Sequence, residues 1–324
     1  MQVFKKTVLF LALLLAVILL LQFALGPIPY YEDAIAEFNE GGYDSIVIGS
    51  SYGNNIDPRL LPEGERVYNL SRPNVPLVDF YYLVREFDKT HDLKTIYLDV
   101  CVPYWTGELG DINRINMLNI LTGANQAEYF TDVLLNTSYN DFFFRYEVNS
   151  NTLRKIPTTM KEKLRIWSDR RNQVPRGPST QGFNFVTDKG DPTLNPENFS
   201  PDKIDPKSLE VFEDLVRYCE EQDIQLVGFM TALPQQRLRA ENLGEVHDYF
   251  TQVFADYGLP LYDFNYIPWE IFPRPTEDFH DMDGHMMGPL AQTQSRLFSE
   301  ILTAGDPASY FLPGYESVLQ NLPS

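Results

Sequence analysis

The sequence is poor in positive charge and in metal-binding side chains. Its 324 residues include 26 Lys and Arg against 45 Asp and Glu, a formal net charge of −19. Because nucleic acid binding depends on Lys and Arg contacts to phosphates, this balance argues against a nucleic acid partner. With two cysteines and four histidines, the chain has no Cys-x-x-Cys pair or His/Cys cluster typical of a metal site. Cys101 and Cys219 allow either one disulfide or two buried thiols.

Charged residues are also missing from an N-terminal run, residues 7–25, which has two polar interruptions. A helix of this length can cross the hydrocarbon core of a bilayer at about 1.5 Å per residue. Lys5 and Lys6 precede the run and are expected to stay cytoplasmic. The alternative is a cleavable signal peptide, but the run is long and lacks a small-x-small cleavage site. The sequence therefore predicts a membrane anchor within residues 1–27 and an extracytoplasmic chain after it.

Strand and helix patterns alternate along the rest of the chain, and apolar residues make up 44% of the whole. Apolar runs predict strands at 45–48, 66–70, 94–100, 225–230 and 259–264. Helical spacing predicts helices at 31–40, 77–88, 206–222, 235–257 and 288–303, the third of them capped by Asp205. Such alternation predicts an α/β fold with a mostly parallel sheet of about five strands.

The alternation pauses between about residues 104 and 200, where Asn, Tyr, Phe and charged residues dominate. Helices are expected near 126–136 and 158–171, and turn-forming residues predict a long loop at 176–201. We interpret this stretch as an insertion in a single domain of residues 28–324.

Two short segments at opposite ends of this domain carry the groups needed for nucleophilic acyl transfer. Ser51 ends a Gly-Ser-Ser turn after the first strand, and His285 lies between two nearby acids and the last helix. In an open parallel sheet, both segments lie at the carboxyl edge of the strands. Ser51 is the predicted nucleophile, His285 the predicted base, and Asp281 or Asp283 the acid that orients it. The alternative is an ordinary turn and a solvated loop that cap helices.

The Gly-Ser-Ser turn and the Asp-rich histidine motif resemble those of the SGNH/GDSL-type serine hydrolases. The similarity is greatest to membrane-anchored members of bacterial cell-envelope polymer pathways, such as D-alanyl transfer to teichoic acids. It covers about residues 42–303 and implies a flavodoxin-like three-layer α/β/α sandwich. It also implies that Ser51 attacks an ester and that His285 acts as base.

The chain departs from that family at two places. The family's acid lies three residues before the histidine, where this sequence has Met282. The oxyanion-hole glycine and asparagine of the family also have no direct counterparts. The candidate donors to the oxyanion are the backbone N–H of Ser51, Asn74, and either Asn54 or Asn55.

The sequence thus predicts an outward-facing, membrane-anchored serine esterase or O-acyltransferase that acts on a cell-envelope glycan or acylated polymer. No metal or organic cofactor is needed. One alternative is a catalytically impaired relative that binds a polymer or assists a membrane acyltransferase partner. Another is an α/β scaffold in which serine and histidine never meet. The distance between Ser51 Oγ and a His285 ring nitrogen separates catalysis from the scaffold.

Overall fold

The structure is a computed structural model. It describes residues 2–25, 30–73, 75–106, 117, 120–134, 157, 160–161, 163–165, 167–168 and 179–323. The chain divides into two compact units, Met1–Asp33 with Phe130–Pro178, and Ala34–Tyr129 with Ser179–Ser324. The second unit contains the sheet and both segments predicted to carry chemistry. The predicted anchor of 1–27 and domain of 28–324 stay predictions.

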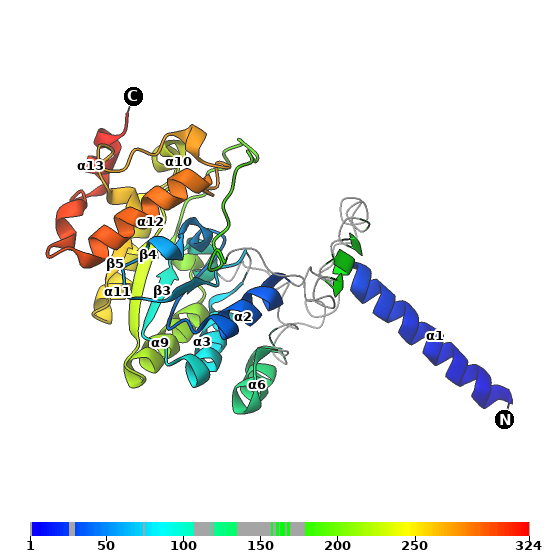
Figure 1. Ribbon diagram of the computed structural model, residues 1–324. Helices are drawn as coiled ribbons and strands as arrows, with labels where there is room; N and C mark the ends of the chain where they lie inside the picture. The colour runs from blue at the N-terminus through cyan, green and yellow to red at the C-terminus, as the bar shows by residue number, and fades with distance from the viewer. Residues whose placement is uncertain are drawn as a thin grey trace. The chain divides into compact units, whose positions relative to one another are not determined.

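Five parallel strands form one sheet in the order β2-β1-β3-β4-β5 (Figure 1). They are β1 Ser45–Ile48, β2 Val67–Asn69, β3 Thr95–Asp99, β4 Gln225–Met230 and β5 Leu261–Asp263. All five lie within the predicted ranges, which confirms the predicted α/β class and parallel sheet. The strand order is that of flavodoxin-like doubly wound sheets.

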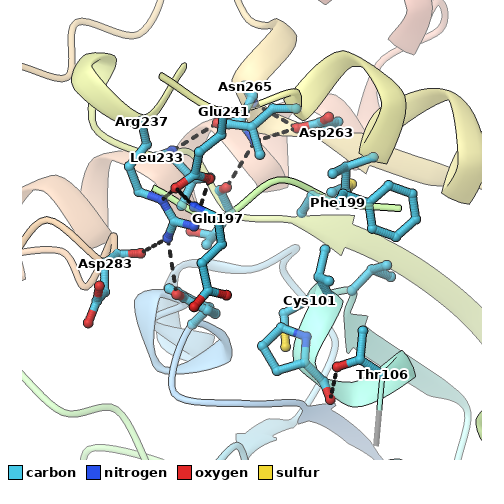
Figure 2. A pocket seen from close by; sticks show the side chains of 18 of the residues that line it. Cys101, Thr106, Glu197, Phe199, Leu233, Arg237, Glu241, Asp263, Asn265 and Asp283 are labelled. Atoms are coloured by element: carbon cyan, nitrogen blue, oxygen red, sulfur yellow. Dashed lines mark hydrogen bonds and ion pairs between the residues drawn. The ribbon is translucent and has the colours of Figure 1, made fainter. Parts of the chain in front are cut away.

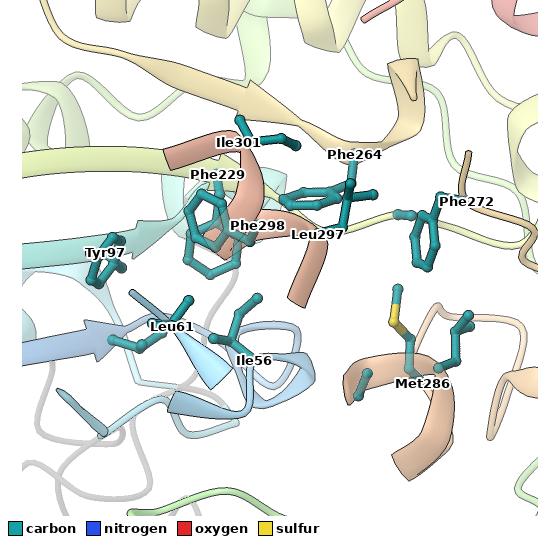
Figure 3. Packing of buried hydrophobic residues seen from close by; sticks show 14 of the residues in the cluster. Ile56, Leu61, Tyr97, Phe229, Phe264, Phe272, Met286, Leu297, Phe298 and Ile301 are labelled. Atoms are coloured by element: carbon teal, nitrogen blue, oxygen red, sulfur yellow. The ribbon is translucent and has the colours of Figure 1, made fainter. Parts of the chain in front are cut away.

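One face of the sheet packs against α12 (Gly288–Thr303). Val47, Tyr97 and Val227 form a row across β1, β3 and β4 and belong to the same apolar cluster as Phe298 of α12. The ring centroids of Tyr97 and Phe298 lie 5.7 Å apart, and Ile56 adds to this cluster from the turn after β1 (Figure 3). This burial fixes the helix that follows the histidine loop.

The opposite face packs against α9 (Pro206–Glu221) and α11 (Leu243–Asp256). A Cβ on Gly228 of β4 would lie 2.3 Å from the Phe254 ring of α11, so glycine lets this helix approach the sheet. Phe212 of α9 packs against the same ring at 5.1 Å. On this side α9 also lies against α3 (Leu77–His91) (Figure 1).

The remaining helical segments complete the described secondary structure. The α-helices are α1 Gln2–Leu25, α2 Tyr30–Gly41, α4 Val102–Trp105, α6 Gly123–Tyr129, α10 Gln235–Ala240 and α13 Tyr315–Asn321. A π-helical turn covers Phe130–Leu134. Short 3-10 turns cover Gly53–Asn55, Pro58–Leu60, Pro201–Lys203, Phe264–Tyr266, Thr276–Asp278 and Pro307–Tyr310.

The prediction of one continuous helix at 235–257 is wrong, because two helices, α10 and α11, cover this range. The break falls at Asn242, whose backbone N–H donates to the Asn198 side chain at 3.2 Å. The Asn242 side chain also bonds the backbone N–H and carbonyl of Phe199, at 2.7 and 2.8 Å. These bonds to a distant segment replace helix bonds that sequence periodicity assumes.

Other expectations have mixed outcomes. Asp205 caps α9 as predicted, by accepting the backbone N–H of Lys207. Residues 179–200 contain no helix or strand, in agreement with the predicted loop. The helix predicted near 158–171 lies largely outside the described residues. Cys101 and Cys219 are both buried free thiols.

Within the described part of the chain, no helix is long and apolar enough to cross a membrane.

Candidate active site

Ser51 lies in the tight turn that follows β1. Gly49 in this turn has a φ of +155°, and a Cβ there would lie 2.3 Å from the Asp99 Cβ, so only glycine fits. Ser50 donates its backbone N–H at 3.2 Å and its hydroxyl at 2.8 Å to Oδ2 of Asp99. The Ser50 hydroxyl accepts the backbone N–H of Tyr52 at 3.1 Å. These bonds fix the backbone on both sides of Ser51, while its own side chain stays partly exposed.

Asp99 supports this turn from the end of β3, where it is 1% exposed. Burial raises the pKa of its carboxyl to about 7, although the hydrogen bond from Ser50 opposes the shift. Burial also raises the pKa of the Cys101 thiol, and the nearby Asp99 adds to that effect. Because the thiolate is the nucleophilic form, this thiol is a poor competitor of Ser51.

His285 lies in a loop that closes on itself just before α12. Phe279 and Met286 pair as an antiparallel bridge at the base of the loop. Oδ1 of Asp281 accepts the backbone N–H groups of Gly284 and His285, both at 3.2 Å. Gly284 has a φ of +109°, a conformation that favours glycine. The loop thus holds the Asp281 carboxylate and the His285 ring on the same side of its backbone.

Ser51, His285 and Asp281 form a continuous hydrogen-bonded row. Oγ of Ser51 lies 2.7 Å from Nε2 of His285, and Nδ1 of His285 lies 2.7 Å from Oδ2 of Asp281. Burial alone would raise the pKa of Asp281, but hydrogen bonds and charge from His285 outweigh it and lower the pKa. An ionised carboxylate only accepts hydrogen bonds, so Nδ1 carries the proton and Nε2 is free to accept the Ser51 hydroxyl.

Of the two acids predicted to orient the histidine, the structure brings only Asp281 to it. The backbone carbonyl of Asp283 accepts Nη1 of Arg237 at 2.6 Å, and its exposed side chain lines a neighbouring pocket. Asp281 reaches the ring from four positions before it because Gly284 turns the backbone. The turn at Gly284 thus lets an acid four residues before the histidine take the place of one three residues before it, where this chain has Met282.

Asn55 joins the nucleophile turn to the histidine loop and is 3% exposed. Its Nδ2 donates to the Gly284 carbonyl and to Oγ1 of Thr231, both at 3.1 Å, and its Oδ1 accepts the backbone N–H of Met286 at 2.9 Å. Both of its amide hydrogens are used in these bonds. Asn55 is therefore placed to position His285 and not to donate to a substrate oxygen.

The candidate oxyanion donors have different environments. The backbone N–H of Ser51 has no hydrogen-bond acceptor among the described residues. Asn54 follows in the 3-10 turn, where its backbone N–H donates to the Ser51 carbonyl at 3.3 Å and its Oδ1 is buried without a partner in the described structure. Asn74 lies outside the described residues. The Ser51 N–H is the donor that the geometry leaves available.

Tyr52 and Arg237, which the sequence did not single out, flank the row. The Tyr52 ring stacks on His285 with centroids 5.2 Å apart and an interplanar angle of 10°. Burial raises the pKa of its hydroxyl, although the charge of Arg237 opposes this. Arg237 is held by two bonds to Glu241 at 2.9 and 2.8 Å, and its Nη1 lies 3.4 Å from the Tyr52 hydroxyl. Arg237 thus links α10 to both Tyr52 and the histidine loop.

A pocket of about 360 Å³ lies at the carboxyl ends of β3, β4 and β5, beside this row (Figure 2). Tyr52 and Asp283 line it near the triad, and Cys101 and Thr106 line it elsewhere. Figure 2 shows Arg237 and Glu241 facing each other on its wall. No sequence motif marks this pocket, because its walls come from six separate stretches of the chain.

The segment 179–200 contacts both the histidine loop and the pocket. The Gly190 N–H donates to the His280 carbonyl at 2.6 Å, and the Asp191 carbonyl accepts the Met282 N–H at 3.4 Å. A few residues later, Glu197 and Phe199 line the pocket. The histidine loop and the pocket are therefore both in contact with this one segment.

Metal-ligating groups are not clustered in the part of the chain that the structure describes, where no three His, Cys, Asp or Glu side chains could together hold an ion.

The geometry defines a class: an α/β protein with a Ser-His-Asp row at the carboxyl edge of a parallel sheet. Beyond this class, the sequence matches no protein-family model and no curated protein. The resemblance to SGNH/GDSL-type hydrolases therefore stays an expectation from the sequence motifs.

Proposed function

We propose that this chain is a serine esterase or O-acyltransferase of the SGNH type. The observation that carries the proposal is the row in which Ser51 Oγ, His285 and Asp281 are joined by two contacts of 2.7 Å. Serine becomes a useful nucleophile when an oriented base removes its proton, and this row provides that base and its orienting acid.

The reaction follows from the contacts. As Ser51 Oγ bonds to the acyl carbon, its proton moves to Nε2 of His285, and Asp281 stabilises the imidazolium. The Ser51 N–H faces the developing oxyanion. The ester C–O bond then breaks, and His285 returns the proton to the leaving alcohol. Water or a second hydroxyl attacks the acyl-enzyme, gives its proton to Nε2, and Ser51 leaves with that proton.

The setting and substrate of this reaction are proposed from the sequence. A place at the cell membrane, with residues 28–324 extracytoplasmic, is proposed from Lys5, Lys6 and the apolar run of residues 7–25, and not from the described helices, none of which qualifies as a membrane span. An acylated cell-envelope glycan or polymer is the proposed substrate. The second candidate function, a polymer-binding accessory protein for a membrane acyltransferase, is favoured by one observation: the family's asparagine donor has no counterpart, and Asn55 is occupied.

A fluorophosphonate probe, which reacts covalently with activated serines, tests the proposal on the full-length chain. We expect wild type to be labelled and Ser51→Ala and His285→Ala to be unlabelled. His247→Ala, which removes a histidine away from this row, should keep full labelling. Labelling that persists in Ser51→Ala contradicts the proposal, and a folded wild type that is never labelled favours the accessory function.

A further inference from the structure

We propose that the pocket beside the triad binds a sugar unit that carries no negative charge, and that Oδ1 of Asp99 forms a hydrogen bond with one of its hydroxyl groups. This inference deepens the proposed function and rests on it for the identity of the reacting group. It concerns binding, so it can be measured without turnover.

The charges that line the pocket are mostly negative. Five acidic and two basic residues line it, namely Asp99, Glu197, Glu241, Asp263, Asp283, Lys203 and Arg237, and all of the acids except the partly protonated Asp99 carry a negative charge near pH 7. An anionic ligand such as a phosphate would meet like charges at several points of the wall. A neutral or amine-bearing ligand would not.

Two of the carboxylates are already satisfied by neighbouring groups. Glu241 holds Arg237 through two bonds, which also removes the more deeply placed cation from use by a ligand. Asp263 accepts Nδ1 of His247 at 2.9 Å and the side chain of Asn265 at 2.8 Å. These pairs form the wall and leave the remaining acids to face a ligand.

The other acids leave hydrogen-bond acceptors in the pocket beyond those that the described residues use. The side chains of Glu197 and Asp283 have no hydrogen-bond or ion-pair partner among the described residues, and Lys203 contacts only a carbonyl at 3.5 Å. A ligand rich in hydroxyl or amino donors matches this surplus. Tyr52 and Phe199 add ring surface of the kind on which a sugar face packs.

Asp99 supplies an independent sign of a missing ligand group. It lines the pocket yet is 1% exposed, and its Oδ2 takes both bonds from Ser50. Its Oδ1 has no partner within the described structure. A buried polar atom without a partner is unfavourable, and the raised pKa of Asp99 reflects that burial. Oδ1 is an acceptor when the carboxyl is ionised and a donor when it is protonated, and a hydroxyl group can partner both forms. A ligand hydroxyl that reaches Oδ1 would supply the missing bond.

The pocket also lies close enough to the triad to hold part of an ester substrate. Tyr52 lines the pocket, follows Ser51 in the chain and stacks on His285. Asp283 lines it from within the histidine loop. A sugar unit bound here contacts both segments that carry the reacting groups.

The test measures binding to the full-length Ser51→Ala protein, so that catalysis plays no part. Methyl glucoside, glucosamine, glucuronic acid and glucose 6-phosphate are compared by ligand-observed NMR titration. We expect the first two to bind roughly tenfold more tightly than the two anionic sugars. Equal or tighter binding of the anionic sugars, or no binding of any of the four, overturns the inference.

A charge reversal in the pocket gives the second arm. Glu197→Lys should weaken the preference for non-anionic sugars by at least about tenfold, because it adds a cation to the wall. Glu210→Lys makes the same change at an exposed position of α9 and should leave all four affinities unchanged. If both variants behave alike, the pocket is not the site. Sugar binding without probe labelling of wild type would retain the pocket and reject the esterase, and the reverse pattern would do the opposite.

Discussion

Among the described residues, two histidines are hydrogen-bonded to an aspartate side chain, and one of the two also meets a serine. In the first pair His285 lies 2.7 Å from Asp281, and in the second His247 lies 2.9 Å from Asp263. The two histidine side chains are similarly exposed, at 29% and 24%. Both rings stack on a tyrosine. Contact with a carboxylate therefore does not by itself mark a catalytic histidine.

The difference lies at the other ring nitrogen. Nε2 of His285 contacts the Ser51 hydroxyl, whereas Nε2 of His247 has no hydroxyl partner among the described residues. His247 instead joins α11 to the end of β5, where Asp263 is 3% exposed. The second pair is a structural contact between helix and sheet. The contact with a serine hydroxyl, and not the His–Asp pair alone, therefore distinguishes the candidate catalytic histidine.

The largest expected effect comes from removing each histidine in turn. His285→Ala should lower the rate of p-nitrophenyl acetate hydrolysis by roughly 10⁴-fold or more, because Ser51 loses its base. His247→Ala should change this rate less than about threefold while lowering thermal stability, since a partly buried contact is lost. Similar rate losses in both variants would show that the two pairs do not differ as described.

Exchanging the carboxylates for amides is expected to have the next largest effect. Asp281→Asn should reduce the same rate by roughly 10³–10⁴-fold, because an amide no longer fixes the protonated Nδ1 tautomer. Asp263→Asn and Asp283→Asn should leave it within about threefold. A loss in Asp283→Asn that equals the loss in Asp281→Asn would reverse the assignment of the acid.

A smaller effect is expected at Asn55, which holds the histidine loop without touching a reacting atom. Asn55→Ala should lower the rate roughly 10- to 100-fold, because the loop that carries His285 is no longer tied to the nucleophile turn. A structural role would show as slower fluorophosphonate labelling with an unchanged pH profile. Asn54→Ala, at the neighbouring position, is the control; a greater loss there would instead favour Asn54 as an oxyanion donor.

The smallest effect concerns stability and the buried acid beneath the turn. The pKa of Asp99 is raised to about 7 in the folded chain from an ordinary value of 3.8. The unfolded chain therefore releases this proton first, and the stability that the protonated form provides is lost as pH rises between these values. The loss is at most about 1.4 kcal/mol per pH unit.

Asp99→Asn removes this titration while it keeps an acceptor for Ser50. Chemical unfolding at pH values from 4 to 8 should show that the stability of the variant, relative to wild type, increases up to about pH 7 and then levels off. A difference that does not vary with pH would mean that Asp99 does not titrate in this range.

The sequence was sufficient to predict the strands of the sheet and two members of the triad, Ser51 and His285. Five apolar runs gave five strands, because strands covered on both faces need continuous apolar residues. Ser51 and His285 were found because each ends a strand-to-helix connection at the same sheet edge. The choice between Asp281 and Asp283 was left open, since it depends on the backbone turn at Gly284.

The rest of the site depends on contacts between residues far apart in the chain. Asn55 and Met286 are separated by 231 positions and Asn242 and Phe199 by 43, so periodicity carries no sign of either bond. The break between α10 and α11 was missed for this reason. The pocket was missed as well, because it is formed by the ends of three strands and by a segment without regular structure.

The segment 179–200 limits how far the histidine loop and the pocket wall can separate. It is attached to the histidine loop at Asp191 and to Glu241 through the Glu197 N–H, at 3.4 Å each. Six residues span at most about 20 Å when fully extended, so the loop and the pocket wall can separate only within that limit unless one attachment breaks. Any displacement of the pocket wall beyond this length therefore also moves the backbone that carries His285 or breaks an attachment.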